Sequence, residues 1–365
     1  MHPPTIATRC STPAVFLAAL VGLSFPFATT AVAGDDDPAA TTVWLRGDAL
    51  ELEVSPRLGG RVLHFSAPGA PNLLRVGDAV REQPDPKVDG TAGDIGYLGH
   101  QLWVGPQGDW WRDQDVNPER RAEAAVWPPD PWLAYAPVTV LEQARDRVRL
   151  QGVDSPVSGV RLDSSYTLQP NRPDTLALDV RMHNIRERPV AHDIWFNTRV
   201  RADTRVFVPV TDATQARIRS DTDETHDGLV GVTDGGVFTL ELQPPAAGKQ
   251  GRRGKVFIQP SAGWMAAFSQ GQAFLVRFEL QPRERIHPEH GQVELYQQWR
   301  PDAPADSLLE MEVHGPYVTL APGEATSARE WWTVRRYAGA ETRDAQLAFL
   351  RAMLAEDIPR KPAID

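Results

Sequence analysis

The amino-acid sequence predicts an all-β protein made of antiparallel strands, and three observations lead to this class. Apolar and polar residues alternate in several segments, which is typical of strands that are buried on one face. Breaks rich in Gly, Pro, Asn and Asp separate these segments. The sequence holds no GxGxxG or phosphate-loop motif and no alternation of strands with helices, which argues against an α/β fold.

The first 33 residues have the layout of a secretion signal. An apolar stretch over 14–27 is followed by the small-residue pattern Ala31-Val32-Ala33. A membrane-spanning helix needs roughly 20 apolar residues, so an uncleaved anchor is the less favoured alternative. We therefore expect residues 1–33 to be a signal peptide and residues 34–41 a flexible acidic N-terminus. Residues 42–365 are then expected to form a single domain that is periplasmic or extracellular.

Cleavage after residue 33 changes the chemistry that the mature chain can use. It removes Cys10, the only cysteine, so neither disulfides nor thiol catalysis is expected. It also removes one positive charge, Arg9, which takes the formal net charge from -10 to -11. An acidic protein gains nothing from counterion release on nucleic acid, so no nucleic-acid partner is expected, and no stable membrane insertion after cleavage. Nothing in the sequence indicates the oligomeric state.

The alternation is clearest in three segments, each expected to be a strand. They are residues 50–54, 176–183 and 274–279, where Leu, Val, Met or Phe alternates with charged residues or His. Turns are expected where Pro, Gly, Asn and Asp gather, for example at 170–174 (PNRPD) and 321–325 (APGEA).

The pattern changes to a helical one near the C-terminus. In residues 341–355, Leu347, Leu350 and Leu354 recur at the spacing that places them on one face of a helix. We expect this short helix to pack on the outside of the sheets.

Residues 84–132 are rich in Pro, Gly, Asp and Trp and have little strand periodicity. Five of the eleven tryptophans lie here: Trp103, Trp110, Trp111, Trp127 and Trp132. A long irregular segment in a compact domain is usually functional or disordered, and five tryptophans argue against disorder. We expect an ordered loop region over one face of a sheet. Its tryptophans either stack on a ligand or close the end of the sandwich.

Three stretches resemble the galactose-mutarotase-like (aldose epimerase) superfamily. They are SPRLGGRVLHFSAPGAPNLL (55–74), Asn184 followed by RPVAHDIWFNTRV (188–200), and YVTLAPGEATSAREWWTVRR (317–336). The stretches GHQLWVGPQGDWW and WPPDPW are similar to a bacterial secreted branch of unknown function. The resemblance implies an antiparallel β-supersandwich and a carbohydrate or glycan as ligand. It does not by itself imply mutarotase activity, because function depends on the site.

The resemblance also indicates which residues could catalyse mutarotation. The family uses a Glu in a Glu-x-Gln context as base, and Glu294 in Glu-Leu-Tyr-Gln is the nearest match, with one extra residue. The family's acid is a His one residue before Tyr-Phe-Asn. Here His192 is two residues before Trp-Phe-Asn, and Asp193 takes the aligned position. The candidate acid is therefore His192 or Asp193, and His192 could instead be a hydrogen-bonded core histidine.

Strand parity gives a test that is independent of the family. In 191–200, Ile194, Phe196 and Val200 are expected to face the core, opposite the polar side chains of that strand. The same argument applied to 293–300 and 308–314 gives one set of side chains on the opposite face: Asp193, Trp195, Asn197, Arg199, Glu294, Tyr296, Gln298, Arg300, Glu310, Glu312 and His314. Arg277 and Glu279 are expected to join this set. If these strands are neighbours, this face offers the charged, amide and aromatic groups that a sugar site needs. The alternative is an ordinary solvated sheet face.

The expected substrate-binding residues are Arg61, His100, Trp103, Trp111, Asn197, Arg199 and Glu312. Arg61 could instead form a salt bridge, and His100 could brace its loop. No metal and no cofactor are expected: Pro288 and the absence of a helical context make zinc-protease spacing inapplicable to His287-Pro288-Glu289-His290. No G-x-S-x-G motif indicates an α/β-hydrolase.

Three functions are consistent with these features. The first is a periplasmic or secreted carbohydrate-recognising protein. The second is an aldose 1-epimerase-like enzyme with a Glu base and a His or Asp acid. The third is a structural or assembly partner in the cell envelope that uses the tryptophans as an interface.

Overall fold

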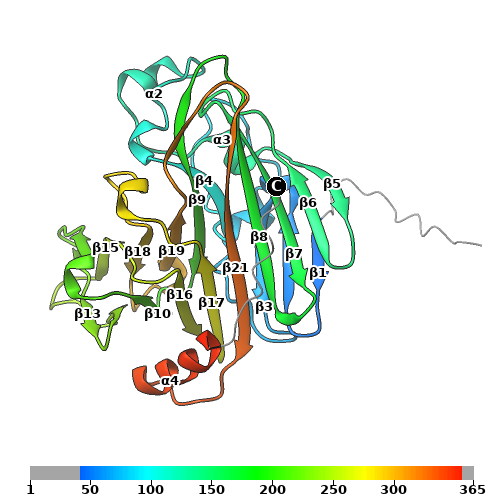
Figure 1. Cartoon of the computed structure of the whole chain (residues 1–365). Coiled ribbons are helices and arrows are strands. Elements are labelled where there is room, and N and C mark those ends of the chain that lie inside the picture. The colour runs from blue at the N-terminus through cyan, green and yellow to red at the C-terminus, as the bar shows by residue number, and fades with distance from the viewer. Residues whose placement is uncertain (1–41, 356–365) are drawn as a thin grey trace, which may run out of the picture. The chain divides into compact units, whose positions relative to one another are not determined.

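The computed structural model describes residues 42–355, and these residues are dominated by two large sheets (Figure 1). The first has eleven strands: in order along the sheet β1 (Val43–Arg46), β2 (Glu51–Ser55), β3 (Arg61–Ser66), β4 (His100–Gly105), β9 (Val190–Val200), β19 (Leu308–His314), β18 (Val293–Trp299), β15 (Gly251–Ile258) and β11 (Ala216–Ser220), with β12 (His226–Asp227) beside β15 and β20 (Val318–Leu320) beside β9.

The second sheet has ten strands. In order they are β13 (Gly231–Asp234), β14 (Val237–Leu240), β10 (Arg205–Pro209), β16 (Trp264–Ser269), β17 (Gln272–Phe278), β21 (Ala325–Arg336), β8 (Arg172–Asn184), β7 (Val160–Gln169), β6 (Arg147–Gln151) and β5 (Thr139–Gln143). All pairings in both sheets are antiparallel except that of β12 with β15. The expected all-β, antiparallel class is therefore confirmed.

Helical elements are short. The α-helices are α1 (Ala79–Glu82), α2 (Pro118–Ala122), α3 (Pro131–Tyr135) and α4 (Arg343–Leu354), and the 3₁₀ turns are η1 (Pro56–Leu58), η2 (Gln107–Asp109), η3 (Ala213–Gln215), η4 (Arg283–Arg285) and η5 (Pro304–Asp306). Within residues 42–355, no helix has the length and apolarity needed to span a membrane.

The core lies between the two sheets. It joins apolar side chains of the first sheet, such as Leu52 and Phe196, to those of the second, such as Leu178, Val276 and Trp332. The three segments expected to be strands lie in β2, β8 and β17, and the side chains that alternate inward are buried. Because the inner face is dry and the alternating pattern has period two, the register of each strand is fixed by burial.

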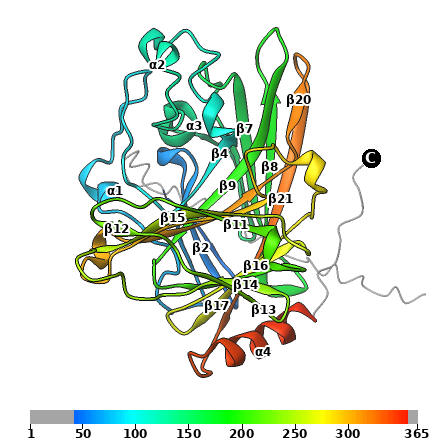
Figure 2. The same cartoon turned by 90° about the vertical axis from the view of Figure 1, so that its left-hand side faces the viewer.

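The expected C-terminal helix is α4, which begins after the N-cap residue Thr342. Leu347 and Leu350 are buried with Phe268 and Tyr337 on the second sheet, and Leu354 is partly buried there. α4 lies at the opposite end of the sheets from α2 and α3 (Figures 1 and 2).

The expectation that 84–132 is an ordered loop region was wrong in part. The segment contains β4, which pairs with β9 over six residues and with β3. Nearly all of β4 is buried on both faces, so its sequence, HQLWVG, does not alternate. A strand buried on both faces loses the period-two signal by which strands are recognised.

The predicted signal peptide and acidic N-terminus lie outside the described residues.

Candidate functional site

The face of the eleven-stranded sheet that points away from the core carries aligned rows of polar and aromatic side chains. Antiparallel register places partners side by side across strands. One row is Lys255, Tyr296, Glu310 and Arg199; the next is Phe257, Glu294, Glu312, Asn197 and Gln101; the third is His314, Trp195 and Trp103. The strands that parity grouped are thus true neighbours, and one sheet face collects their polar side chains.

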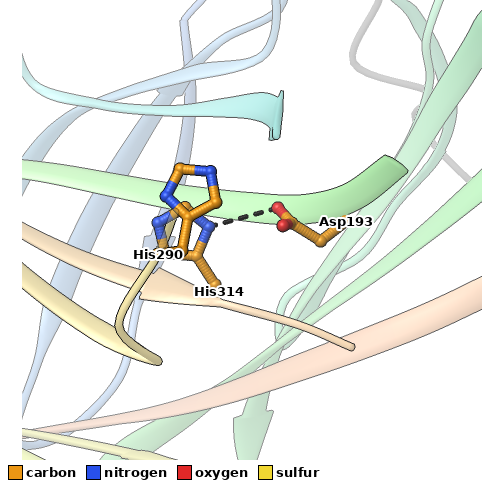
Figure 3. A group of neighbouring side chains, drawn as sticks. All are labelled: Asp193, His290 and His314. Carbon is orange, nitrogen blue, oxygen red and sulfur yellow. Dashed lines mark hydrogen bonds and ion pairs between the residues drawn. The ribbon is translucent and has the colours of Figure 1, made fainter. Parts of the chain in front are cut away.

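We define the polar cluster as Asp193, Lys255, His290, Glu294, Glu312 and His314. His314 lies between two carboxylates, with Nδ1 3.2 Å from Asp193 Oδ1 and Nε2 3.8 Å from Glu294 Oε1. Figure 3 shows the contact between His314 and Asp193, with His290 beside them. The rings of His290 and His314 stack with centroids 4.1 Å apart.

Lys255 and His290 contact the glutamates of the polar cluster. Lys255 Nζ lies 2.7 Å from Glu294 Oε2 and 2.8 Å from Glu312 Oε2. His290 Nδ1 is 2.8 Å from Glu294 Oε1, which also accepts a hydrogen bond from the Gly291 amide at 3.0 Å. Glu294 is therefore the most heavily bonded carboxylate of the cluster.

The polar cluster is buried, so its sheet face is not an ordinary solvated one. Asp193, Glu294, Glu312 and His314 are each 0% exposed. The row that holds Lys255 and Glu310 is partly exposed, and these two side chains are 12% and 15% exposed. Burying this many ionisable groups is costly unless they are paired, which indicates that the arrangement has a role beyond stability.

Burial and mutual charge set the protonation states. Burial disfavours the charged form of His314, but Asp193 and Glu294 outweigh it and raise the pKa of His314 to about 9. Burial disfavours ionised Glu294 too, but Lys255 and His314 hold its pKa well below the usual value. For Glu312, burial and the neighbouring glutamates raise the pKa more than Lys255 lowers it, and the pKa is about 8. At neutral pH the cluster therefore contains an ionised Glu294 beside a protonated His314.

Several buried polar atoms around the cluster have no hydrogen-bond partner among the described residues. They are Asp193 Oδ2, Asn197 Oδ1, and the ring nitrogens His290 Nε2, His314 Nε2, Trp103 Nε1 and Trp195 Nε1. Buried polar groups in native proteins are almost always satisfied, by protein, water or a bound group. This concentration on one sheet face is the clearest sign of a binding site in the described part of the chain.

Gly105 makes room for Asp193 on the neighbouring strand. A Cβ atom at position 105 would lie 2.6 Å from Asp193 Oδ1 and 2.9 Å from Oδ2, closer than real contacts allow. The absence of a side chain on β4 thus lets the Asp193 carboxylate reach His314.

Tryptophans cover one side of the cluster. Trp103 packs edge-to-face against Trp195, with centroids 5.0 Å apart, and against Trp110. Trp127 lies over Trp103 and Trp110 and is 46% exposed. Apart from Trp127, this group is largely buried, and its rings pack against one another.

Six of the ten predicted site residues lie on this sheet face. They are Asp193, Glu294, Trp103, Asn197, Arg199 and Glu312. Arg199 donates to Glu310 at 2.8 Å and covers the Trp103 ring at 4.6 Å, while Asn197 Nδ2 is 3.4 Å from Glu312 Oε1.

The other four predicted residues lie elsewhere. His192 has its two ring nitrogens 3.2 and 3.1 Å from the carbonyls of Gly105 and Ser158, and it is separate from the polar cluster. His100 belongs to strand β4 rather than to a loop, and it faces the core, where Nδ1 is 2.9 Å from Thr198 Oγ1. Both histidines hold backbone or core groups in place.

Arg61 and Trp111 have structural contacts. Arg61 is buried and donates to the carbonyls of Leu98 and Ala134, which ties β3 to the segments before β4 and at the end of α3. Trp111 is fully buried and donates through Nε1 to the Pro128 carbonyl at 2.7 Å. Neither is a member of the polar cluster.

The expectation that Arg277 and Glu279 join this face was wrong. Arg277 lies in β17 of the second sheet and donates to the Met353 carbonyl of α4. Glu279 follows β17 and is exposed. Parity assigns a residue to a face of its own strand but does not say which sheet the strand joins.

His290, His314 and Lys255 were not predicted as site residues. Parity placed His314 on this face with Glu310 and Glu312, but His314 was not among the expected catalytic or binding residues. Lys255 lies in β15, opposite Tyr296 of β18. The alternation of β15 could also have placed Lys255 on this face. His290 lies in the loop before β18, where no periodicity exists, and its only signal in the sequence is its spacing from His287.

Two overlapping groups of side chains could hold a metal ion. Asp193, His290 and His314 form one, and Glu294, Glu312 and His314 form the other; within each, the ligand atoms lie within 4.8 Å of one another.

Solved structures similar to this chain support the fold. A candidate aldose 1-epimerase from Klebsiella pneumoniae subsp. pneumoniae MGH 78578 is 12% identical, covers 84% of this chain and 81% of its own, and has a TM-score of 0.53. A protein from Synechocystis sp. PCC 6803 is 16% identical over 81% of this chain and 96% of its own, with a TM-score of 0.51. A galactose mutarotase-like protein from Lactobacillus casei ATCC 334 is 10% identical over 81% of this chain and 100% of its own, with a TM-score of 0.45.

The first two of these similarities confirm the predicted galactose-mutarotase-like β-supersandwich, and at this level of identity they concern the fold alone. A search of curated proteins found no match. Residues 41–335 match the family described as a domain of unknown function (DUF4380), which also fits the predicted uncharacterised branch of the superfamily. Because this match spans most of the chain, the protein belongs to the family of the domain of unknown function DUF4380.

Proposed function

We propose that this protein recognises a carbohydrate on the sheet face that carries the polar cluster. The observation that supports this most is the set of unpartnered buried donors and acceptors beside Trp103 and Trp195. Sugars are bound by fixed polar groups that contact hydroxyls and by flat aromatic faces that contact ring C–H groups. The likeness to a candidate aldose 1-epimerase supports the same ligand class.

The sugar would enter from the partly exposed side of the cluster. Lys255, Tyr296 and Glu310 are partly exposed, and Trp127 in the tryptophan group is exposed. Because the innermost groups are fully buried, we infer that the segment over 107–130 moves when the ligand enters.

Direct binding tests this proposal. Purified full chain would be titrated calorimetrically with a panel of monosaccharides and short oligosaccharides. We expect binding of at least one sugar, weakened by Glu312→Gln and by Trp127→Ala. Trp331→Ala is the matched control, since Trp331 is a partly exposed tryptophan of the second sheet. Absence of binding across the panel, or equal loss with the control, would contradict the proposal.

An aldose 1-epimerase-like activity is the second candidate, and the protonation of the cluster favours it. Mutarotation needs a base for the anomeric hydroxyl and an acid for the ring oxygen. Ionised Glu294 could be the base, and protonated His314 could be the acid, oriented by Asp193. In this arrangement His314 takes the role for which His192 or Asp193 was expected.

Measuring the interconversion of anomers of common aldoses by polarimetry or NMR distinguishes an enzyme from a protein that only binds sugar. General acid–base catalysis contributes about 10²–10⁴-fold, so Glu294→Gln and His314→Gln should each lower the rate by that order. Glu279→Gln, an exposed Glu outside the cluster, should retain it. Rates that are equal and negligible in all proteins would leave carbohydrate recognition without catalysis.

We also propose that the mature protein acts in the periplasm or outside the cell, on the basis of the signal-like residues 1–33. Mass spectrometry of the protein secreted by a bacterial host should give a mature chain that begins at Gly34. An intact N-terminus in the cytoplasmic fraction would contradict this.

A further inference from the structure

Asp193, His290 and His314 come from three separate parts of the chain and bring their ligand atoms close together. Asp193 is on β9, His314 ends β19, and His290 lies in the loop that precedes β18. Their ligand atoms lie within 4.8 Å of one another. Figure 3 shows the three side chains side by side. All three residues are more than nine-tenths buried.

We propose that Asp193, His290 and His314 bind a divalent transition-metal ion such as Zn²⁺. Two imidazoles and one carboxylate are a ligand set that Zn²⁺ and Fe²⁺ accept, and they leave further positions open for a substrate or water. The proposal does not depend on carbohydrate recognition, because it uses only the chemistry of these three side chains.

Each of the three residues has a buried polar atom without a hydrogen-bond partner among the described residues, although His314 Nε2 lies 3.8 Å from Glu294 Oε1. These atoms are Asp193 Oδ2, His290 Nε2 and His314 Nε2. A buried ring nitrogen or carboxylate oxygen that meets neither protein nor solvent is unfavourable. A metal ion would bind lone pairs of all three at once, and His314, which is protonated without metal, would release the proton on Nε2 to solvent when the ion binds.

His290 already has the outer contact that metal-binding histidines use. Its Nδ1 is 2.8 Å from Glu294 Oε1, which is fixed in turn by the Gly291 amide and Lys255. A carboxylate that accepts Nδ1–H places the proton on that nitrogen and leaves Nε2 with a free lone pair. Glu294 thus orients His290 as a metal ligand without binding the metal itself.

The alternative group of Glu294, Glu312 and His314 is less suited to a metal. Lys255 Nζ already bridges the two glutamates at 2.7 and 2.8 Å and occupies the place of a cation. An added ion there would meet a buried positive charge. The carboxylate of Asp193, by contrast, has only His314 as its ion-pair partner among the described residues.

Binding requires one local adjustment. The rings of His290 and His314 are stacked at 4.1 Å with an interplanar angle of 24°, whereas lone pairs lie in the ring planes. The two rings must therefore tilt toward a common point. His290 is in a loop rather than in a strand, so its side chain can turn while the strands that hold Asp193 and His314 stay fixed.

The experiment uses the full chain after treatment with EDTA and dialysis. Zn²⁺ would be titrated calorimetrically, and bound metal would be counted by inductively coupled plasma mass spectrometry. We expect one Zn²⁺ per chain, and at least tenfold weaker binding in Asp193→Asn and His290→Gln. Ca²⁺, which prefers oxygen ligands, should bind far more weakly.

His287→Gln is the matched control, because His287 lies in the same loop and is not in the ligand group. Circular dichroism and thermal unfolding in EDTA show whether each variant folds, and Co²⁺ absorption reports the ligand field independently of affinity. Loss of the Co²⁺ spectrum in folded His290→Gln but not in His287→Gln would support the site. Failure of the wild type to bind Zn²⁺, or equal binding by the wild type and His290→Gln, would overturn it. Neither result bears on sugar binding, which is measured separately.

Discussion

At the scale of single residues, the site depends on small features that bring charges together. Asp193 reaches His314 because Gly105 opposite it has no side chain. His314 then bridges toward Glu294, and Lys255 joins Glu294 to Glu312. A change at any of these positions leaves a buried charge without its partner, which is more costly than the loss of an exposed pair.

Gly105→Ala should disrupt the Asp193–His314 contact although neither of these two residues is replaced. The new Cβ would collide with the Asp193 carboxylate, and displacing that group should cost about 1–3 kcal/mol of unfolding free energy. Gly108→Ala is the control, because its nearest neighbour would be Glu289 Oε2 at 3.6 Å, an ordinary contact. Urea denaturation measures both. Equal stability of the two variants would show that Asp193 has room to move.

The protonated side chains of the cluster predict a stability that falls as pH rises. The pKa of Glu312 is raised to about 8 from 4.5, and that of His314 to about 9 from 6.5, so the fold holds protons that the unfolded chain releases. Their contribution is complete below the unfolded values and is lost through pH 8 and 9. Urea denaturation between pH 6.5 and 9 should show this fall.

Glu312→Gln cannot ionise, so its decline over the same range should be shallower. An unchanged slope in Glu312→Gln, or a wild type that gains stability between pH 6.5 and 9, would contradict these protonation states.

At the scale of elements, the segment over 84–132 both completes the sheet and covers the site. β4 contributes Gln101, Trp103 and Gly105 to the site face, and the rest of the segment places Trp110 and Trp127 above it. Trp111 instead anchors the segment through the Pro128 carbonyl and under the Arg120 guanidinium, 4.4 Å from its ring.

Trp111 and Trp127 should therefore differ when replaced by Ala. Trp111→Ala removes a fully buried ring and should cost about 3–5 kcal/mol. Trp127→Ala removes a ring that is 46% exposed and should change stability by about 0.5 kcal/mol, while weakening sugar binding. Chemical denaturation and calorimetry separate the two effects. A large loss of stability in Trp127→Ala would mean that Trp127 is part of the core rather than of the ligand surface.

The sequence could predict elements only where one face is dry and the other wet. β2 and β8 show this alternation, β17 shows it only around the half-buried Arg277 because α4 covers its other face, and α4 shows the helical spacing. The sequence of β4 does not alternate, because both faces of this strand are covered. His290 could not be assigned to a face, because a loop has no periodic pattern. The parity argument selected Asp193, Glu294 and Glu312 correctly as one face. It could not exclude Arg277, because sheet membership depends on contacts between distant segments.

At the scale of the whole domain, the two sheets have different roles. The ten-stranded sheet buries one face in the shared core and supports α4 with its other face. The eleven-stranded sheet shares the same core and uses its second face for the buried polar rows. The fold thus supplies a rigid base on which Asp193, Glu294 and Glu312 keep fixed positions, which is what precise recognition requires.

The central claim is that a ligand completes the polar cluster, and a crystal structure of the full chain soaked with a sugar that binds in calorimetry tests it most directly. We predict density for the sugar against Glu312, Asn197 and the tryptophan group, with the segment over 107–130 displaced from its present position. A sugar bound only on another surface, with the polar cluster still closed and its buried atoms unchanged, would contradict the claim.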